Sequence, residues 1–398
     1  MLVLVDVLIL YRHKNGLSIE RITPRRLSNG DENDIHLNIS STYNTLLNLE
    51  IIDEIPHQFQ IRNFSLKLKL DKTDRKSVNY KLRPTDRGEY NFGHTLGYIS
   101  STLGLVKRRY KFHTQVTVPV YPSFIQMRKF ELYAISNRLT DLGVKKVRRL
   151  GHTLEFDQIK NYVPGDDIRS INWKATARSN DLMVNQYQDE RSQQVINVID
   201  MGRVMKMPFN GLHLLDYAIN TSLVISNIAL LKQDKAGLIS FSNKKATVIK
   251  PEQKRTHIQK IQEGLYNIET NFHESDFERL YVVLRQKVTQ RSLILFYTNF
   301  ETLSSMQRQL PYLQRIAKDH LLVTIFFENT ELTSLLEQES KTVGDIYTKA
   351  IAETFSYEKR EIVRYLNQRG IQTILTPPQD LSVNAINKYL ELKSRGMI

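Results

Sequence analysis

The stretch YVPGDDIRSINWKATAR, from Tyr162 to Arg178, combines two adjacent carboxylates, three cationic side chains and the only tryptophan of the chain. Paired carboxylates beside arginines can bind a metal ion, carry out acid-base chemistry or hold two structural elements together. Residue types and spacing leave these three uses open. The choice depends on the elements that position the stretch and on the other chemistry that the chain carries.

The composition excludes some classes of chemistry. The chain has 398 residues, no cysteine and a formal net charge of +14. Without cysteine, disulfides, zinc-thiolate sites, iron-sulfur clusters and cysteine nucleophiles are excluded. A positive charge attracts nucleic acid or anionic lipid headgroups. Basic and acidic residues are interleaved, however, and the one dense cluster, VKKVRRLG from Val144 to Gly151, is predicted to be a solvated linker that also suits a membrane-facing role.

The first residues, MLVLVDVLILYRHK, form an apolar run that Asp6 interrupts and Arg12, His13 and Lys14 close. A membrane-spanning helix needs about 20 apolar residues, so this run is about half of one. Residues 1–16 are therefore predicted to be a buried first strand, an interfacial anchor or the remnant of a membrane anchor. If a span preceded them, the cationic cluster would place the rest of the chain on the cytoplasmic side.

Residues 17–121 show the period-two alternation of half-buried strands, as at Ile35, Leu37 and Ile39. Polar turns such as SNGDEN and DKTDRK separate these short segments. The pattern predicts an all-β domain, an antiparallel β-sandwich of immunoglobulin-like type. Residues 122–150 are then predicted to be a helical linker, because apolar residues after Tyr121 fall near helical spacing.

From residue 195 onward, apolar runs alternate with segments of helix length. This pattern predicts a parallel sheet covered on both faces, a doubly wound α/β domain that spans residues 195–398. Such sheets bind ligands at the carboxyl ends of their strands, where Asp200, Ser242 and Asn299 are expected. The predicted strands are Val195–Asp200, Ala236–Phe241, Ser292–Tyr297, Leu321–Phe327 and Ile371–Leu375.

The common catalytic signatures are absent from the sequence. It contains no G-x-x-x-x-G-K, G-x-G-x-x-G, G-x-S-x-G or H-E-x-x-H pattern. The histidines His94, His113 and His152 have no partner at the spacing that metal ligation on a helix would need. These observations favour a protein that is not an enzyme.

The segment YVPGDDIRSINWKATARSNDLMVNQYQDERSQQVINVID resembles the signature of the domain-of-unknown-function 58 (DUF 58) family. That signature reads Y-x-P-G-D-D-x-R-x-I-x-W-K-x-x-A-R, then L-x-V, Y-x-x-E-R and an apolar strand that ends in aspartate. The resemblance implies a von Willebrand factor A-like, Rossmann-like doubly wound domain after the signature segment, residues 151–194. It also implies an association with MoxR-type AAA+ ATPases, and many members begin with two transmembrane helices.

Von Willebrand factor A-like domains often carry a metal-ion-dependent adhesion site, with D-x-S-x-S after the first strand, a threonine from a second loop and a later aspartate. Here Asp200 remains, whereas Gly202 and Val204 stand where the serines would be. Thr270 is the candidate second-loop ligand, and Asn299 replaces the later carboxylate. The resemblance thus implies a degenerate site without a cofactor, in which Arg203 neutralises Asp200 in place of Mg²⁺.

The signature stretch itself is interpreted as a structural clasp between linker and α/β domain, because no nucleophile, histidine or third ligand lies near it in sequence. Pro164 and Gly165 suit the centre of a type II turn, and Asp166 or Asp167 suits a cap for the turn that follows. Trp173 is expected to be a large apolar anchor. The residues assigned to this clasp are Tyr162, Pro164, Gly165, Asp166, Asp167, Arg169, Trp173, Arg178, Glu190 and Arg191.

The predicted function is that of a non-enzymatic interaction or adaptor protein, which acts with a MoxR-type AAA+ ATPase at the cytoplasmic face of the membrane. The carboxyl edge of the sheet, around Asp200, Arg203, Thr270 and Asn299, is the predicted docking surface. Two alternatives stay open: a Mg²⁺-dependent protein-binding A-domain, and electrostatic binding of nucleic acid, which is not expected as the main role.

Overall fold

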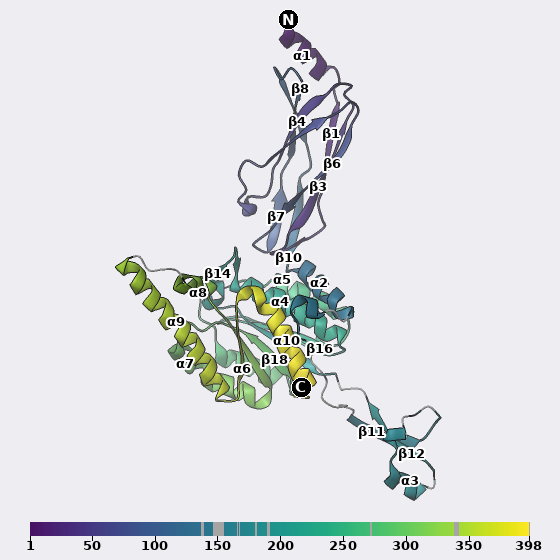
Figure 1. Cartoon of the computed structure of the whole chain (residues 1–398), viewed down its shortest axis with the longest axis vertical. Helices are drawn as coiled ribbons and strands as arrows, with labels where there is room; N and C mark the ends of the chain where they lie inside the picture. Colours follow the sequence, from purple (N-terminus) through teal and green to yellow (C-terminus); the bar gives the residue numbers. More distant parts are fainter. Residues whose placement is uncertain are drawn as a thin grey trace. The chain divides into compact units, whose positions relative to one another are not determined.

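The computed structural model describes residues 1–136, 139–145, 155–164, 166, 168–179, 181–188, 192–270, 273–337 and 342–397. The chain divides into two compact units. Figure 1 traces the chain from helix α1 in purple to helix α10 in yellow. Unit 1 holds Met1–Lys129, Met207–Leu223 and Gln262–Ile268, and unit 2 holds Phe130–Lys206, Val224–Ile261 and Glu269–Ile398.

Helix α1, Leu2–Tyr11, opens unit 1, so the first residues are not a strand. The run lacks the alternation of apolar and polar residues that a half-buried strand would show. Asp6, its one charged residue, is buried, and Oδ2 accepts hydrogen bonds from the backbone nitrogens of Leu105 and Val106 at 3.0 and 2.8 Å. The helix is therefore tied to the loop before β9 (Lys107–Phe112), while most of its apolar side chains are exposed.

Within the fully described residues 17–121, ten strands form three sheets around one apolar core. The sheet orders are β1-β3-β6, β2-β10-β7 and β5-β4-β8-β9, and only the β2–β10 pair is parallel. Ile35, Leu37 and Ile39 of β3 all point into this core, as their alternation predicts. The other strands are β1 Leu17–Ile22, β2 Leu27–Ser28, β3 Asn33–Ser41, β4 Leu47–Asp53, β5 Ser65–Leu70, β6 Arg75–Leu82, β7 Gly88–Phe92, β8 Thr95–Ser101 and β10 Val116–Tyr121.

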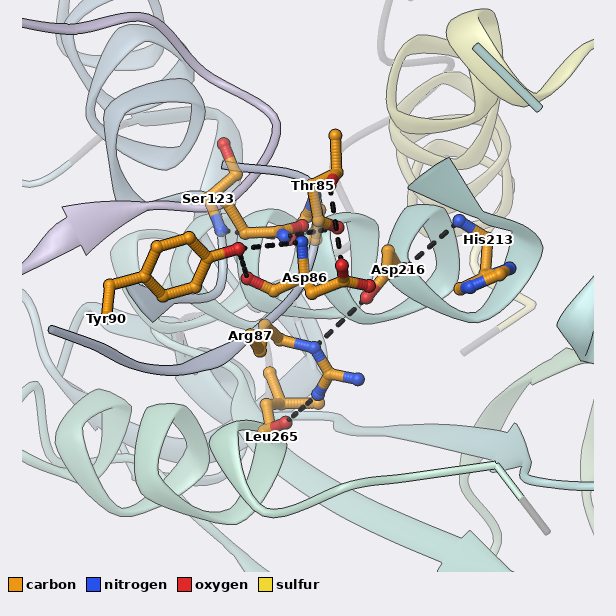
Figure 2. A network of polar contacts seen from close by, with 10 residues as sticks. Thr85, Asp86, Arg87, Tyr90, Ser123, His213, Asp216 and Leu265 are labelled. Atoms are coloured by element: carbon orange, nitrogen blue, oxygen red, sulfur yellow. Dashed lines mark hydrogen bonds and ion pairs between the residues drawn. The ribbon is translucent and has the colours of Figure 1, made fainter. Parts of the chain in front are cut away.

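A polar network in unit 1 joins the β7 turn to later parts of the chain (Figure 2). The Arg87 guanidinium donates to Asp216 Oδ1 at 3.1 Å and to the backbone oxygen of Leu265 at 2.7 Å. Asp216 Oδ2 also accepts a hydrogen bond from the backbone nitrogen of His213 at 3.1 Å. Unit 1 therefore includes residues from beyond the predicted sandwich, because these later segments supply the partners of buried polar groups.

Unit 2 is built on a six-stranded sheet with the order β17-β16-β13-β18-β19-β20. Numbered along the chain, this order is 3-2-1-4-5-6, which is the order of the doubly wound Rossmann-like fold. All neighbours pair in parallel except β17 and β16, which are antiparallel. The five predicted strands all lie in this sheet. Its strands are β13 Gln194–Asp200, β16 Lys235–Phe241, β17 Ala246–Glu252, β18 Leu293–Tyr297, β19 Leu321–Phe327 and β20 Gln372–Thr376.

Helices follow the strands of this sheet in alternation, as the sequence predicts. Helices α6, α7 and α9 pack against one another in succession, and α9 and α10 contact β20. The apolar side chains of α6, α7 and α9 share a core with the sheet, which includes the ring cluster of Phe241, Phe277 and Phe296. The helices are α2 Phe124–Ile135, α4 Leu214–Leu231, α5 His257–Tyr266, α6 Phe277–Lys287, α7 Leu303–Asp319, α8 Thr330–Glu337, α9 Val343–Asn367 and α10 Leu381–Ser394.

Helix α4 is the one helix in the described part of the chain that is long and apolar enough to cross a membrane. Within the protein, 89% of it is buried. The helix begins in unit 1 and ends in unit 2. A helix in the core of a protein is also apolar on all sides. The burial of α4 therefore explains its apolar composition.

Candidate functional site

The carboxyl edge of the sheet is centred on Asp200, which ends β13 and is 1% exposed. Its Oδ1 accepts hydrogen bonds from the backbone nitrogen of Gly202 at 2.8 Å and from the Ser275 hydroxyl. Its Oδ2 accepts one from the Thr298 hydroxyl at 2.7 Å. Burial raises the pKa of Asp200, while these three donors act in the opposite direction. The carboxyl group is thus enclosed by donors of the protein itself.

Gly202 stands where the adhesion-site pattern has its first serine. A Cβ at this position would lie 2.5 Å from Ser275 Oγ and 3.0 Å from Asp200 Oδ1. The close approach of the loop to Asp200 therefore requires glycine. Val204, at the second serine position, is partly buried on the short helix η4, Arg203–Lys206.

The structure corrects the predicted surroundings of Asp200. The Arg203 side chain is exposed and, among the described residues, has no ion pair with Asp200, so the predicted neutralisation is wrong. Its backbone nitrogen instead donates to the oxygen of His273 at 3.1 Å. Thr270 makes no hydrogen bond with Asp200 in the described part of the chain, because Thr298 supplies that hydroxyl.

Sequence reasoning missed both hydroxyl donors. Thr298 is the first residue after β18, so the rule that polar residues gather at strand ends could have found it. Ser275 lies in the loop before α6, where no pattern in the sequence marks it. Its contact with Asp200 joins residues 75 positions apart.

Asn299, the replacement for the later carboxylate, is 5% exposed, and its Oδ1 accepts a hydrogen bond from Lys359 Nζ. Lys359 lies three residues before Ile362 and seven before Leu366, which are both buried, so it belongs to the inward face of α9. Burial lowers the pKa of Lys359 to about 8, and the charge of Glu301 opposes this change. The cationic group at this edge of the sheet is therefore the side-chain amine of Lys359.

This arrangement does not fit a hard cation. Mg²⁺ takes near-octahedral oxygen ligands and favours ionised carboxylates. The oxygens of Asp200 already accept hydrogen bonds from three donors, and its raised pKa disfavours the ionised form. In the described part of the chain, no three His, Asp or Glu side chains come together in a metal-binding group. Because Asp200 and Asn299 are buried, their side chains also offer no docking surface.

The signature segment forms a second candidate site, an antiparallel hairpin of β11 (Glu155–Asn161) and β12 (Met183–Gln188). Asp166 closes its first turn, since Oδ2 accepts from the backbone nitrogen of Val163 at 3.0 Å and Oδ1 from Lys160 Nζ at 2.9 Å. The hydrogen bond from Lys160 lowers the pKa of Asp166. The cationic partner is thus Lys160, which the sequence analysis did not single out.

Asn172 fixes the far end of this hairpin. Its Oδ1 accepts a hydrogen bond from the backbone nitrogen of Ala175 at 3.0 Å, so Asn172 caps helix α3, Trp173–Ser179. Its amide nitrogen donates to Asn185 Oδ1 on β12 at 2.8 Å. The Thr176 hydroxyl accepts a hydrogen bond from the backbone nitrogen of Met183 at 3.0 Å. Asn172 is therefore the capping residue of α3, whereas Asp166 accepts its backbone hydrogen bond from Val163 in the preceding turn.

The predicted apolar anchor is not buried. Trp173 is 70% exposed, and Ile168, on the short helix η3 (Ile168–Ser170), is 70% exposed as well. Pro164 lies in the turn that Asp166 closes, and Tyr162 donates its backbone N–H to the oxygen of Leu182 at 2.7 Å. Arg169 lies on η3 and Arg178 on the last turn of α3. Gly165, Asp167, Glu190 and Arg191 lie outside the described residues.

Parts of the chain are similar to known proteins. The family model described as "Protein of unknown function DUF58" matches residues 158–353. A curated relative, the uncharacterized protein YeaD of Bacillus subtilis (strain 168), is 27% identical over 126 residues. That match covers 31% of this chain and 31% of the relative, so the chain spans about a third of the length of the relative.

Solved structures also resemble parts of the chain. The SpRpn10 VWA domain is 10% identical, with 49% of this chain and 94% of that chain covered and a TM-score of 0.31. The hypothetical protein BatB from Bacteroides thetaiotaomicron is 11% identical, with 52% and 100% covered and a TM-score of 0.31. The PapD-like domain 7 of human CEP192 is 13% identical, with 27% and 85% covered and a TM-score of 0.22.

The match to residues 158–353 begins in the signature hairpin and continues through most of the six-stranded sheet. The strand order of that sheet is the order expected of a doubly wound domain. The chain therefore matches the DUF58 family over residues 158–353, and the sheet in this region has the doubly wound, Rossmann-like strand order.

Proposed function

We propose that this chain is a non-enzymatic adaptor protein, which binds a MoxR-type AAA+ ATPase at the cytoplasmic face of a membrane. We also propose that residues 17–121 form an immunoglobulin-like sandwich. The enclosure of Asp200 carries this proposal. A carboxylate that serves as a metal ligand or as a base must keep an oxygen free for its partner. Asp200 instead accepts hydrogen bonds from Gly202, Ser275 and Thr298.

The proposal includes no metal. The amine of Lys359 lies against Asn299, at the position where the adhesion-site pattern would have a carboxylate. A cation of the protein at this place opposes the approach of Mg²⁺. Binding to the partner then depends on shape and charge and not on a bridging metal ion.

Helix α1 supports the membrane part of the proposal. Leu4 and Leu8 of α1 are exposed, and so are Leu103 and Leu105 in the loop to which Asp6 ties the helix. Exposed apolar side chains from two neighbouring elements form a patch that a bilayer interface can cover. Arg12 and Lys14, which follow the helix, are cationic and exposed, as contact with anionic headgroups requires.

The direct test is a binding titration of the full chain with a purified MoxR-type AAA+ ATPase from the same organism, with ATP and with ADP. We expect association that depends on the bound nucleotide. We also expect Asp200→Asn to bind as the native chain does, since the proposal gives Asp200 a structural role only. Absence of association with either nucleotide overturns the proposal. Loss of binding in Asp200→Asn, with the fold retained, would instead restore a metal-dependent interface.

A further inference from the structure

The signature hairpin leaves its large apolar side chains outside. Trp173 and Ile168 are each 70% exposed, and Val163 and Leu182 are also exposed. Among the side chains described between residues 159 and 185, only Val184 is buried. Exposed large apolar residues that cluster in one short segment are typical of interaction sites.

These side chains lie on a scaffold that is stabilised from within. Asp166 accepts hydrogen bonds from Lys160 and from the backbone of Val163, and Asn172 caps α3 and bonds to β12. An isolated bridge also joins Ile171 to Val184. The polar residues of the signature thus form the internal bonds of the hairpin. Its apolar residues are displayed in a fixed arrangement, which lowers the entropic cost of binding a partner.

The charge beside Trp173 indicates the chemistry of that partner. Helix α3 carries Lys174 and Arg178 four positions apart, which places them on one side of the helix, and it contains no acidic residue. Tryptophan and arginine are the residues most enriched among those that dominate binding energy at protein interfaces. A second copy of this chain would bring another +14 charge to the contact, so an acidic surface is favoured over self-association.

We propose that the signature hairpin docks onto an acidic surface of a partner protein, with Trp173 as the apolar anchor and Lys174 and Arg178 as the groups that meet its carboxylates. This inference rests on the proposed function in one respect, that the chain acts through a protein partner. The docking surface is then the hairpin and not the carboxyl edge of the sheet, where Asp200 and Asn299 are buried.

Trp173 supplies its own reporter, because it is the only tryptophan of the chain. We would follow its fluorescence emission and its quenching by iodide in the full chain. Three probes are added separately: the purified MoxR-type ATPase, polyglutamate, and vesicles of phosphatidylglycerol. We expect the ATPase to shift the emission to shorter wavelength and to protect it from iodide, and polyglutamate to do so more weakly and only at low salt.

Variants then measure the contribution of each group. Trp173→Ala and Arg178→Glu should each weaken binding of the ATPase about tenfold or more, as measured by a label placed elsewhere, because truncation of such residues costs over 1 kcal/mol. Trp173→Phe should retain part of the affinity. The matched controls are Tyr347→Ala, a 70% exposed aromatic residue on α9, and Lys72→Glu, an exposed cation of unit 1. Neither control should change binding.

The outcomes separate this inference from the proposed function. If the ATPase binds the native chain, Trp173→Ala and Arg178→Glu with equal affinity, the docking inference is overturned and the adaptor function stands. If the ATPase does not bind, the proposed function fails, and the experiment with polyglutamate then tests the docking inference. A shift of the Trp173 emission that Arg178→Glu abolishes supports the docking inference. The absence of any shift overturns it. A shift with vesicles alone assigns the hairpin to lipid and overturns the inference as well.

Discussion

Arg87 donates a hydrogen bond to the carboxylate of Asp216, 129 positions later in the sequence, and the two side chains are 9% and 5% exposed (Figure 2). The same guanidinium bonds to the backbone oxygen of Leu265. Three segments of unit 1 that are distant in sequence therefore meet at one arginine. Buried charges have lost their hydration, so each member of such a pair needs the opposite charge of the other to compensate for that loss.

Replacement of Arg87 should destabilise unit 1. In Arg87→Leu, Asp216 stays buried without its cation, and breaking a buried pair in this way costs about 3–5 kcal/mol. Chemical denaturation followed by circular dichroism measures the free energy of unfolding. The control is Lys81→Ala, which removes an exposed ion pair with Glu32 and should leave the stability unchanged. Equal stability of Arg87→Leu and the native chain would contradict a structural role for the pair.

Gly202→Ala tests the packing around Asp200. The added Cβ would lie 2.5 Å from Ser275 Oγ, so the hydroxyl must leave Asp200 and the carboxyl group loses a donor. We expect a loss of about 1–3 kcal/mol in the free energy of unfolding, as for other buried polar groups left unsatisfied. Gly344→Ala is the control, since only Thr342 Oγ1 lies near its Cβ position, at 3.6 Å. A neutral Gly202→Ala would show that the loop can move away at little cost.

Mg²⁺ should not stabilise the protein. A site present at about a hundredfold excess of ligand over its Kd would add about 2.7 kcal/mol to the free energy of unfolding, which thermal melting detects easily. Because Asp200 is enclosed by Gly202, Ser275 and Thr298, we expect equal melting temperatures in Mg²⁺ and in a chelator. A rise in Mg²⁺ that Asp200→Asn abolishes would refute this expectation.

Lys359 should make stability depend on pH. Burial lowers its pKa from 10.5 to about 8, so between these values the unfolded chain binds more protons than the folded chain. The cost of the charged buried amine is present in full below pH 8 and disappears as the pH rises towards 10.5. The native chain should therefore gain stability relative to Lys359→Met over this window, as measured by denaturation at each pH. Parallel pH profiles would mean that the amine is solvated.

The apolar patch on α1 should bind lipid. We expect the full chain to sediment with vesicles of phosphatidylglycerol, and the double variant Leu4→Glu, Leu8→Glu to stay in the supernatant with its stability unchanged, because both side chains are exposed. Leu132→Glu, an exposed position on α2, serves as the control. Binding that survives in the double variant would place the lipid contact elsewhere.

Much of the α/β architecture could be predicted from the sequence. The apolar runs that include Val195–Asp200 and Leu321–Phe327 are long and lie between helical segments. Runs of this kind are typical of buried strands in a parallel sheet, so both the strands and their parallel pairing could be predicted. The antiparallel edge strand β17 was not predicted, because Ala246–Glu252 mixes charged and apolar residues and is only partly buried. Helix α1 was not predicted as such either, since a short apolar run gives no periodicity to interpret.

The candidate sites were less predictable than the fold. Asp200 and Asn299 could be placed at the sheet edge because they follow strands, but their partners Ser275 and Lys359 come from loops and helices with no comparable rule. Trp173 shows a further limit. Its size suggested a buried anchor, yet the hairpin that carries it has too few residues to cover it. Exposure depends on neighbouring elements and is not encoded in the residue type.

The link between Arg87 and Asp216 also has a consequence for synthesis on the ribosome. Translation proceeds at about 5–20 residues per second, so Arg87 would emerge about 6–26 s before Asp216. During this interval the strands of unit 1 can pair, but the arginine lacks its partner and the segments Met207–Leu223 and Gln262–Ile268 are missing. Unit 1 therefore cannot reach its complete form until Ile268 has been synthesised.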